Sequence, residues 1–236
     1  MALLGDKPEW LTFDCYGTLI QWDEGLLAAV DTILARHAGS GIDAATLIET
    51  YDRFEHELEQ TPPHRSFRDV AGTGLEMAME ALNLPYSEAD IATLTTGIST
   101  MPPFAEVTDT LTALKNMGFK LCIISNTDDD IIAGNVAQMD GLIDRVITAQ
   151  QAQSYKPSRA MFDHAHTALG ITREDVVHIC ASPHLDLAAA RDMGFRCIWI
   201  NRGTGRTPLA DYAADAEFPS LDKVPELFTQ LGWQNP

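Results

Sequence analysis

The chain has 236 residues, 45% of them apolar, which is enough to bury one large domain or a core with a smaller insertion. Sixteen basic against 34 acidic residues give a formal charge of −18, so nucleic acid and anionic membranes are disfavoured as partners. The same field repels a small anionic substrate, so a site for one must gather the few cations locally.

The start of the chain and the cysteines bear on location. Residues 1–9 show no basic segment followed by an apolar one, and the apolar window at residues 26–35 is too short to span a bilayer. The cysteines lie in or beside expected strands and lack the CxxC spacing of a metal site. We therefore expect a cytoplasmic protein with reduced, packed thiols at Cys15, Cys122, Cys180 and Cys197.

The first expected element is a short buried strand that starts at Trp10 and ends at Asp14. Gly17 then permits a sharp turn. A carboxylate at the carboxyl end of such a strand faces the crevice where open α/β sheets bind ligands. Asp14 is therefore a candidate nucleophile, although on its own it also fits an ordinary turn residue.

Residues 21–101 change character, because apolar residues recur there at helical spacing and no strand pattern occurs. Asp43 fits the N-cap of one of these helices, and Pro62-Pro63 interrupts the pattern. An all-helical block inserted after a first strand predicts a cap domain.

From residue 102 the pattern alternates between strand and helix. We expect strands at residues 119–126, 145–148, 176–181 and 196–201, and helices at 106–117, 128–139, 159–169, 182–193 and 220–231. Repeated βα units predict a parallel sheet covered on both faces. The fold prediction is therefore α/β, with a Rossmann-like core at residues 1–20 and 102–236 and an all-helical cap at residues 21–101.

Polar residues follow each of the expected core strands. The carboxyl ends of parallel strands meet at one edge of a sheet, so these side chains should converge on one crevice. Considered one at a time, these residues also have ordinary structural explanations. Ser125-Asn126 fits a turn between a strand and a helix, and Lys156 fits a surface ion pair. The converging set is Asp14, Ser125, Asn126, Lys156 and Asp186.

The order and spacing of these segments resemble the haloacid dehalogenase superfamily, in particular its type II, L-2-haloacid dehalogenase-like branch. The first motif of that branch reads D-x-Y-G-T-L, as residues 14–19 do here. The likeness covers nearly the whole chain, including Ser125-Asn126, Tyr155-Lys156-Pro157 and residues 199–202. The resemblance implies a Rossmann-like core, a helical cap and a homodimer.

Phosphatases of the superfamily carry a second aspartate two residues after the nucleophile, where this chain has Tyr16. We expect Asp14 and Asp186 to be the only carboxylates in the crevice. Two carboxylates supply few of the oxygen ligands that Mg²⁺ prefers. The resemblance therefore implies a site without metal or cofactor, in which Lys156 is the electrostatic partner of the nucleophile.

The expected mechanism has two displacements. Asp14 attacks a carbon that bears a leaving group and forms an ester, which water then hydrolyses. Thr18 and Ser125 orient the carboxylate and stabilise charge on its oxygens. Asn126 and Tyr16 contact the substrate or the leaving group, and Asp186 keeps Lys156 charged.

Three positions depart from the dehalogenase pattern. Pro183 stands where those enzymes carry an asparagine that helps to position water, and the adjacent His184 is either a general base or an exposed residue. Those dehalogenases use an arginine of the cap to receive the halide, and the matching stretch of this chain cannot be aligned without a gap. Arg53, Arg65 and Arg68 are therefore alternative candidates for this role. Phe162 replaces a tyrosine, whereas Trp22 and Phe67 fit either an apolar pocket or the cap core.

The leading functional hypothesis is metal-independent hydrolysis of a small 2-substituted carboxylic acid, most simply an (S)-2-haloacid. Attack on a strained C–N ring such as azetidine-2-carboxylate uses the same mechanism. A Mg²⁺-dependent phosphatase and a catalytically inactive binding module are the alternatives in other classes.

Overall fold

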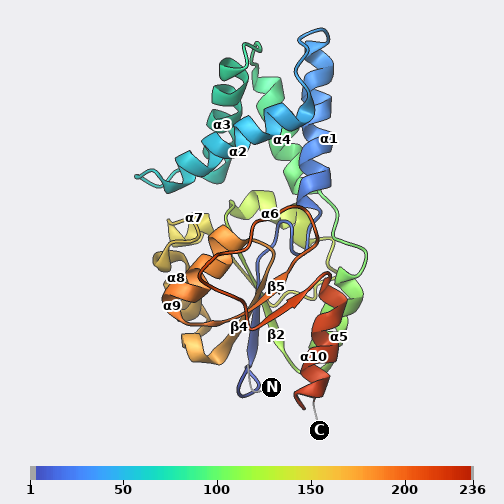
Figure 1. The fold of residues 1–236 in the computed structure, drawn as a ribbon, viewed down its shortest axis with the longest axis vertical. Coiled ribbons are helices and arrows are strands. Elements are labelled where there is room, and N and C mark those ends of the chain that lie inside the picture. Colours follow the sequence, from blue (N-terminus) through green and yellow to red (C-terminus); the bar gives the residue numbers. More distant parts are fainter. Residues whose placement is uncertain (1–3, 235–236) are drawn as a thin grey trace.

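The computed structural model describes residues 4–234. Residues 1–3, on which the expected lack of a secretory signal partly depends, lie outside that range. The helices α1–α4 gather beyond one edge of the sheet, and the remaining helices flank it (Figure 1). In the described part of the chain, no helix combines the length and apolarity needed to cross a membrane.

All six strands of the sheet are parallel, and β1 lies in the middle of the order β3-β2-β1-β4-β5-β6. The strands are β1 (Trp10–Phe13), β2 (Lys120–Ser125), β3 (Arg145–Thr148), β4 (Val176–Cys180), β5 (Arg196–Ile200) and β6 (Ala216–Phe218). Phe13 pairs with Ile123 of β2 on one side and with Ile179 of β4 on the other. Asp14 therefore leaves the sheet at its centre.

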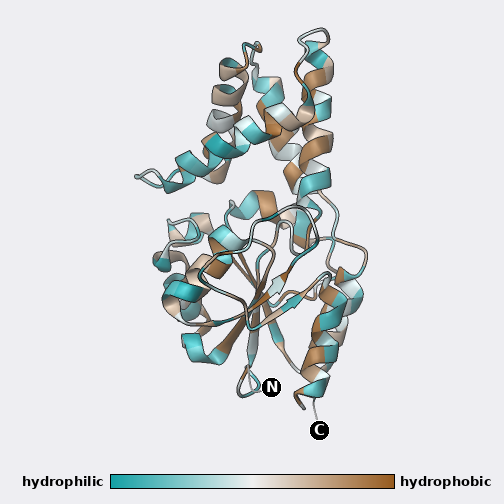
Figure 2. Ribbon diagram, in the orientation of Figure 1, coloured by the Kyte–Doolittle hydropathy of each residue, from teal (hydrophilic) through white to brown (hydrophobic). Residues whose placement is uncertain are grey.

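Alternate residues of each strand serve the two faces of the sheet, as the pleat requires. Leu121 and Ile123 of β2 belong to the hydrophobic cluster on one face, whereas Cys122 and Ile124 belong to the cluster on the other. Figure 2 colours the central strands mainly as hydrophobic. Both faces are covered, which explains the nearly continuous apolar runs in the sequence.

The covering helices largely follow the sequence expectation. They are α5 (Val107–Asn116), α6 (Asp129–Val136), α7 (Ala149–Ala152), α8 (Arg159–Leu169), α9 (Ala188–Met193) and α10 (Val224–Gln230), with short turns η2 (Arg173–Asp175) and η4 (Leu221–Lys223). The helix expected at 182–193 is instead divided into a π-helical turn η3 (Pro183–Leu187) and α9. The strand β6 was not predicted, because three partly exposed residues form no apolar run.

Residues 22–100 contain helices α1 (Trp22–Leu34), α2 (Ala44–Gln60), α3 (Phe67–Ala81) and α4 (Glu88–Thr100), and the short turn η1 (Ala35–His37). The Asp43 side chain accepts a hydrogen bond from the Thr46 N–H and so caps α2, as expected. Asp128 at the start of α6 accepts from the backbone N–H groups of Phe67 and Arg68, which ties α3 to the core. The α/β Rossmann-like fold is confirmed, whereas the division into two domains stays a prediction.

Candidate active site

A cavity of about 520 Å³ opens where the carboxyl ends of β1, β2 and β4 approach α2 and α3. Nine of the eleven predicted site residues line it, and Thr18 and Asp186 lie outside its lining. The nine are Asp14, Tyr16, Trp22, Arg53, Phe67, Ser125, Asn126, Lys156 and His184.

The Asp14 carboxylate is held at both oxygens. Lys156 Nζ lies 2.8 Å from Oδ1, and the Thr18 hydroxyl donates to Oδ2 over 2.7 Å. Asp14 is only 7% exposed, and its exposed part faces the cavity. A buried carboxylate of fixed orientation is well suited to attack a carbon atom that approaches from the cavity.

Lys156 is fully buried between two carboxylates, because its Nζ is also 2.8 Å from Asp186 Oδ1. Burial opposes its positive charge, but Asp14 and Asp186 outweigh that effect and raise the pKa of Lys156. Burial likewise raises the pKa of Asp186, but Lys156 and His178 lower it below its ordinary value. The lysine is therefore charged at neutral pH and neutralises the nucleophile.

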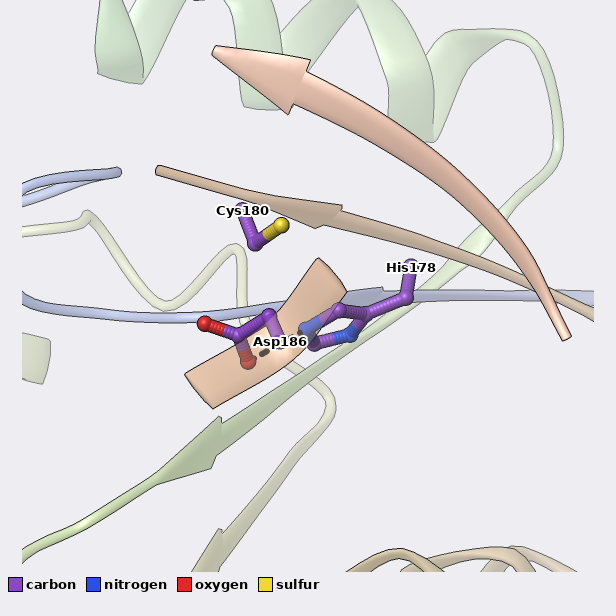
Figure 3. A group of neighbouring side chains, drawn as sticks. All are labelled: His178, Cys180 and Asp186. Carbon is purple, nitrogen blue, oxygen red and sulfur yellow. Dashed lines mark hydrogen bonds and ion pairs between the residues drawn. The ribbon is translucent and has the colours of Figure 1, made fainter. Parts of the chain in front are cut away.

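His178 was not predicted as part of this network. It lies inside β4, is 1% exposed, and its Nε2 is 3.0 Å from Asp186 Oδ1 while Nδ1 is 2.8 Å from the Thr12 hydroxyl. Figure 3 shows the imidazole directed at the Asp186 carboxylate. In the sequence, the one indication of this role is a histidine within an otherwise apolar strand. Its partner, Asp186, lies eight residues further along the chain.

His178, Cys180 and Asp186 offer three donor atoms within 4.8 Å of one another (Figure 3). The mixture of nitrogen, sulfur and oxygen suits Zn²⁺ or another transition metal rather than Mg²⁺. However, His178 and Lys156 both bond to Asp186, and Cys180 Sγ lies 3.5 Å from Cys197 Sγ. We interpret the group as a buried hydrogen-bond network that supports the lysine.

The loop after Asp14 is held from the C-terminal part of the chain. Arg202 donates to the carbonyl oxygens of Gly17 (3.2 Å) and Thr18 (2.7 Å), and forms an ion pair with Glu106 at 2.8 Å. Gly17 has φ +81°, and a Cβ there would lie 2.8 Å from a nitrogen of Arg206. The positive φ of this turn therefore favours glycine, whereas the contact is with the flexible end of the Arg206 side chain, which can move aside.

The polar residues at the carboxyl end of β2, Ser125 and Asn126, make different contacts. Ser125 is 1% exposed and lines the cavity, and its Oγ has no hydrogen-bond partner among the described residues. Asn126 Oδ1 accepts from the Lys156 N–H (2.7 Å), and its Nδ2 donates to Glu59 (3.1 Å). Asn126 thus holds the lysine backbone in place and contacts α2, in addition to lining the cavity.

Tyr16 and Trp22 form an aromatic wall, with ring centroids 5.2 Å apart. The Tyr16 hydroxyl donates to Asn135 Oδ1 over 2.9 Å, so it is engaged with α6. Phe67 at the start of α3 is buried and lines the same cavity. These rings supply an apolar environment around the carboxylate.

Among the three rival arginines only Arg53 lines the cavity, and its guanidinium lies 4.3 Å from the Phe54 ring centroid. Arg65 and Arg68 are exposed and pair with Asp69 (3.8 Å) and Asp130 (2.7 Å). The sequence reasoning missed Arg206, which lines the cavity and pairs with Asp23 at 3.2 Å. It follows a glycine-rich segment without periodicity, so only the folded chain brings it to the site.

His184, in the turn η3, is exposed and lines the cavity. The preceding Ser182 accepts a hydrogen bond from the Leu185 N–H over 3.3 Å and caps the turn. From this position His184 can contact both solvent and a bound ligand.

The expectation that Asp14 and Asp186 are the only carboxylates in the crevice is wrong. Asp52, Glu55 and Glu59 of α2 also line the cavity, on the side opposite the sheet. Their i, i+3, i+7 spacing places them on one helix face. Much of α2 is coloured as hydrophilic in Figure 2.

Burial, and then Asp52, raises the pKa of Glu55 to about 8. In the unfolded chain this carboxyl titrates near its ordinary value of about 4.3. Between these two pH values the folded protein binds a proton that the unfolded chain has lost, so stability falls as pH rises through this range.

Glu55→Gln should therefore raise the free energy of unfolding by about 1–2 kcal/mol at pH 9 and by less at pH 4. Urea denaturation at both pH values measures it. The exposed Glu57, outside the cavity lining, provides the control Glu57→Gln, which should change little at either pH. An equal effect of Glu55→Gln at both pH values would contradict the linkage.

A magnesium-dependent reaction needs several free oxygen ligands. Here the two oxygens of Asp14 bond to Lys156 and Thr18, and Asp186 Oδ1 bonds to Lys156 and His178. The ammonium group lies between the two carboxylates that would otherwise share the metal. The crevice around Asp14 therefore does not fit Mg²⁺.

Comparison with known proteins gives consistent matches. A family model described as haloacid dehalogenase-like hydrolase matches residues 9–194. Haloacetate dehalogenase H-2 of Moraxella sp. (strain B) is 26% identical and covers 94% of this chain and 98% of its own. An (S)-2-haloacid dehalogenase of Pseudomonas sp. (strain YL) is 28% identical, covering 94% and 95%. The crystal structure of the L-2-haloacid dehalogenase RSc1362 superposes with a TM-score of 0.84 at 24% identity, over 95% of this chain and 100% of that one.

Proposed function

This chain belongs to the haloacid dehalogenase-like hydrolases, and on that basis we propose that it hydrolyses small 2-substituted carboxylic acids, with (S)-2-haloacids as the leading substrates. The names of two relatives that match almost the whole chain support this reaction class. The substrate is a small carboxylate, and the reaction proceeds without a metal ion or other cofactor.

The main support for the proposal is the triplet Asp14–Lys156–Asp186, in which one buried ammonium lies 2.8 Å from each carboxylate. A lysine supplies a fixed positive charge beside the nucleophile, and a carboxylate oxygen that accepts one hydrogen bond keeps a further lone pair with which to attack carbon. This charge balance supports attack on carbon better than attack on phosphorus, whose extra negative charge needs further cations.

In the proposed first step, an Asp14 oxygen bonds to the 2-carbon of the substrate, the carbon–halogen bond breaks, and halide leaves with the electron pair. In the second step, water attacks the ester carbonyl carbon of Asp14. The 2-hydroxy acid is released, Asp14 is regenerated, and one proton passes to solvent. Thr18 and the Lys156 ammonium hold the Asp14 carboxylate in position for the first step and stabilise the negative charge that develops on its oxygens in the second.

A substrate panel tests the reaction. We expect halide release from (S)-2-chloropropanoate, undiminished by EDTA, and no phosphate release from small phosphate esters with or without Mg²⁺. Azetidine-2-carboxylate with analysis for ring-opened product completes the panel, because the same attack opens a strained C–N ring. Phosphate release that depends on Mg²⁺, with no halide from any haloacid, would overturn the proposal.

We further propose His184 as the base that activates water in the second step, because it is the histidine of η3 on the cavity wall. His184→Ala should then slow ester hydrolysis about 10²-fold or more and accumulate substrate-modified Asp14, seen by mass spectrometry. His56→Ala is the matched control, since His56 also lines the cavity from α2 and should leave turnover unchanged. Full turnover of His184→Ala without an adduct would refute the role.

Four buried, free cysteines support a cytoplasmic location, where thiols stay reduced. A homodimer is proposed from the family resemblance alone, and sedimentation velocity would test it.

A further inference from the structure

Three carboxylates, those of Asp52, Glu55 and Glu59, form what we call the acidic wall of the cavity. None of them has a basic side chain within 4 Å among residues 4–234. The Asn126 amide donates to Glu59 over 3.1 Å, and the Tyr51 hydroxyl interacts with Glu55 and lowers the pKa of that carboxyl. A simple haloacid, an anion with a halogen, has no group that such a wall would bind, and any negative charge on the wall repels it.

The cations that line the cavity form no ion pair with this wall within the described residues, although Arg206 lowers the pKa of Asp52 and Lys156 that of Glu59. Lys156 is bound to Asp14 and Asp186, and Arg206 to Asp23. Arg53 lies over the Phe54 ring and lines the cavity without an acidic partner in the described part of the chain. The cavity thus presents an unpaired guanidinium together with three unpaired carboxylates.

A second feature marks the same cavity as a site for a polar ligand. Ser125 is 1% exposed, and its Oγ lacks a hydrogen-bond partner in the region that the structure describes. A buried hydroxyl without a partner costs free energy, and a ligand carboxylate can supply the missing acceptor.

Electrostatics within the wall point the same way. Burial, and then Glu55, raises the pKa of Glu59 well above its ordinary range. Neighbouring carboxylates disfavour each other's charge, and a cation placed between them removes that repulsion. The wall is therefore arranged to gain from a positively charged ligand group.

We propose that the natural substrate is zwitterionic: a 2-substituted carboxylic acid that carries an ammonium group, received by Glu55 and Glu59 of the acidic wall. The substrate carboxylate lies toward Ser125 and Arg53, and the 2-carbon faces Asp14. This assignment rests on the proposed function for the identity of the reacting carbon, but its charge argument depends only on the cavity.

Two unreactive products separate binding from chemistry. 4-Amino-2-hydroxybutanoate and 2-hydroxypentanoate have the same number of non-hydrogen atoms and differ by an ammonium in place of a methyl group. Calorimetry with the wild-type protein at pH 7.5 should give a Kd about tenfold or more lower for the amino compound. In Glu55→Gln/Glu59→Gln the ratio should fall to about one, whereas Glu57→Gln should keep it.

Equal binding of the two compounds by the wild type, or a preference that survives in the double variant, would overturn the inference. Halide release from (S)-2-chloropropanoate, measured in parallel, tests the reaction independently. Halide release with equal binding leaves the proposed function standing and removes the inference. Selective binding of the amino compound with no halide from 2-chloropropanoate or 4-amino-2-chlorobutanoate retains the inference about the cavity and removes the proposed reaction.

Discussion

Asp14→Asn should lower kcat for halide release by about 10⁴-fold or more, because loss of a nucleophile removes the covalent route altogether. The amide has nearly the same shape as the carboxylate and can keep the hydrogen bond from Thr18, 2.7 Å long in the wild type. The variant should therefore fold, and an unchanged circular dichroism spectrum would verify it. Halide release under substrate saturation measures the effect.

A single-turnover reaction in H₂¹⁸O distinguishes the proposed route from direct attack of water on the substrate. Attack of water on the ester carbonyl puts the label into Asp14, whereas direct attack puts it into the hydroxy acid. We expect the label in the peptide that contains Asp14 when enzyme exceeds substrate. Label in the product alone, or substantial activity of Asp14→Asn, would contradict nucleophilic catalysis.

Lys156→Met should affect both activity and stability. The substitution leaves two buried carboxylates, Asp14 and Asp186, without the ammonium that lies 2.8 Å from each. Removing one partner from a buried ionic group costs about 3–5 kcal/mol of unfolding free energy. Dehalogenation should fall about 10³-fold or more, since the charge that stabilises the reacting oxygens is lost.

The stability effect should depend on pH in a defined direction. The raised pKa of Lys156 means that its contribution is complete below about pH 10 and is lost only as pH rises through the folded-state pKa. The lowered pKa of Asp186 means that its contribution is present above about pH 4 and is lost in acid. The difference between wild type and Lys156→Met should thus be largest between about pH 5 and pH 10.

Urea denaturation at pH 3 and pH 7.5 measures this dependence. Lys120→Met is the matched control, because Lys120 forms an exposed ion pair with Glu9 at 2.5 Å and such pairs contribute about 0–1 kcal/mol. An equally small loss for both lysine variants at pH 7.5 would show that Lys156 does not neutralise the two carboxylates.

The amino-acid sequence alone was enough to predict five of the six strands of the sheet and one side of the site. Parallel strands end at a common edge, so the order of strands and of their terminal polar residues was enough to bring Asp14, Ser125, Lys156 and Asp186 together. Strand β3 and helix α8 begin and end where the periodicity predicts. These features depend on local hydrophobic pattern and on the chirality of βα connections, both of which are properties of short segments.

What faces this edge of the sheet became visible only in the folded chain. The polar face of α2 looks in sequence like any solvated helix face, and only the way the helix crosses the core turns Glu55 and Glu59 into the cavity. Arg206 and His178 likewise acquire their meaning from partners elsewhere in the chain, Asp23 and Asp186. Periodicity reveals which side of an element is apolar, whereas the direction of its polar side is fixed by long-range packing.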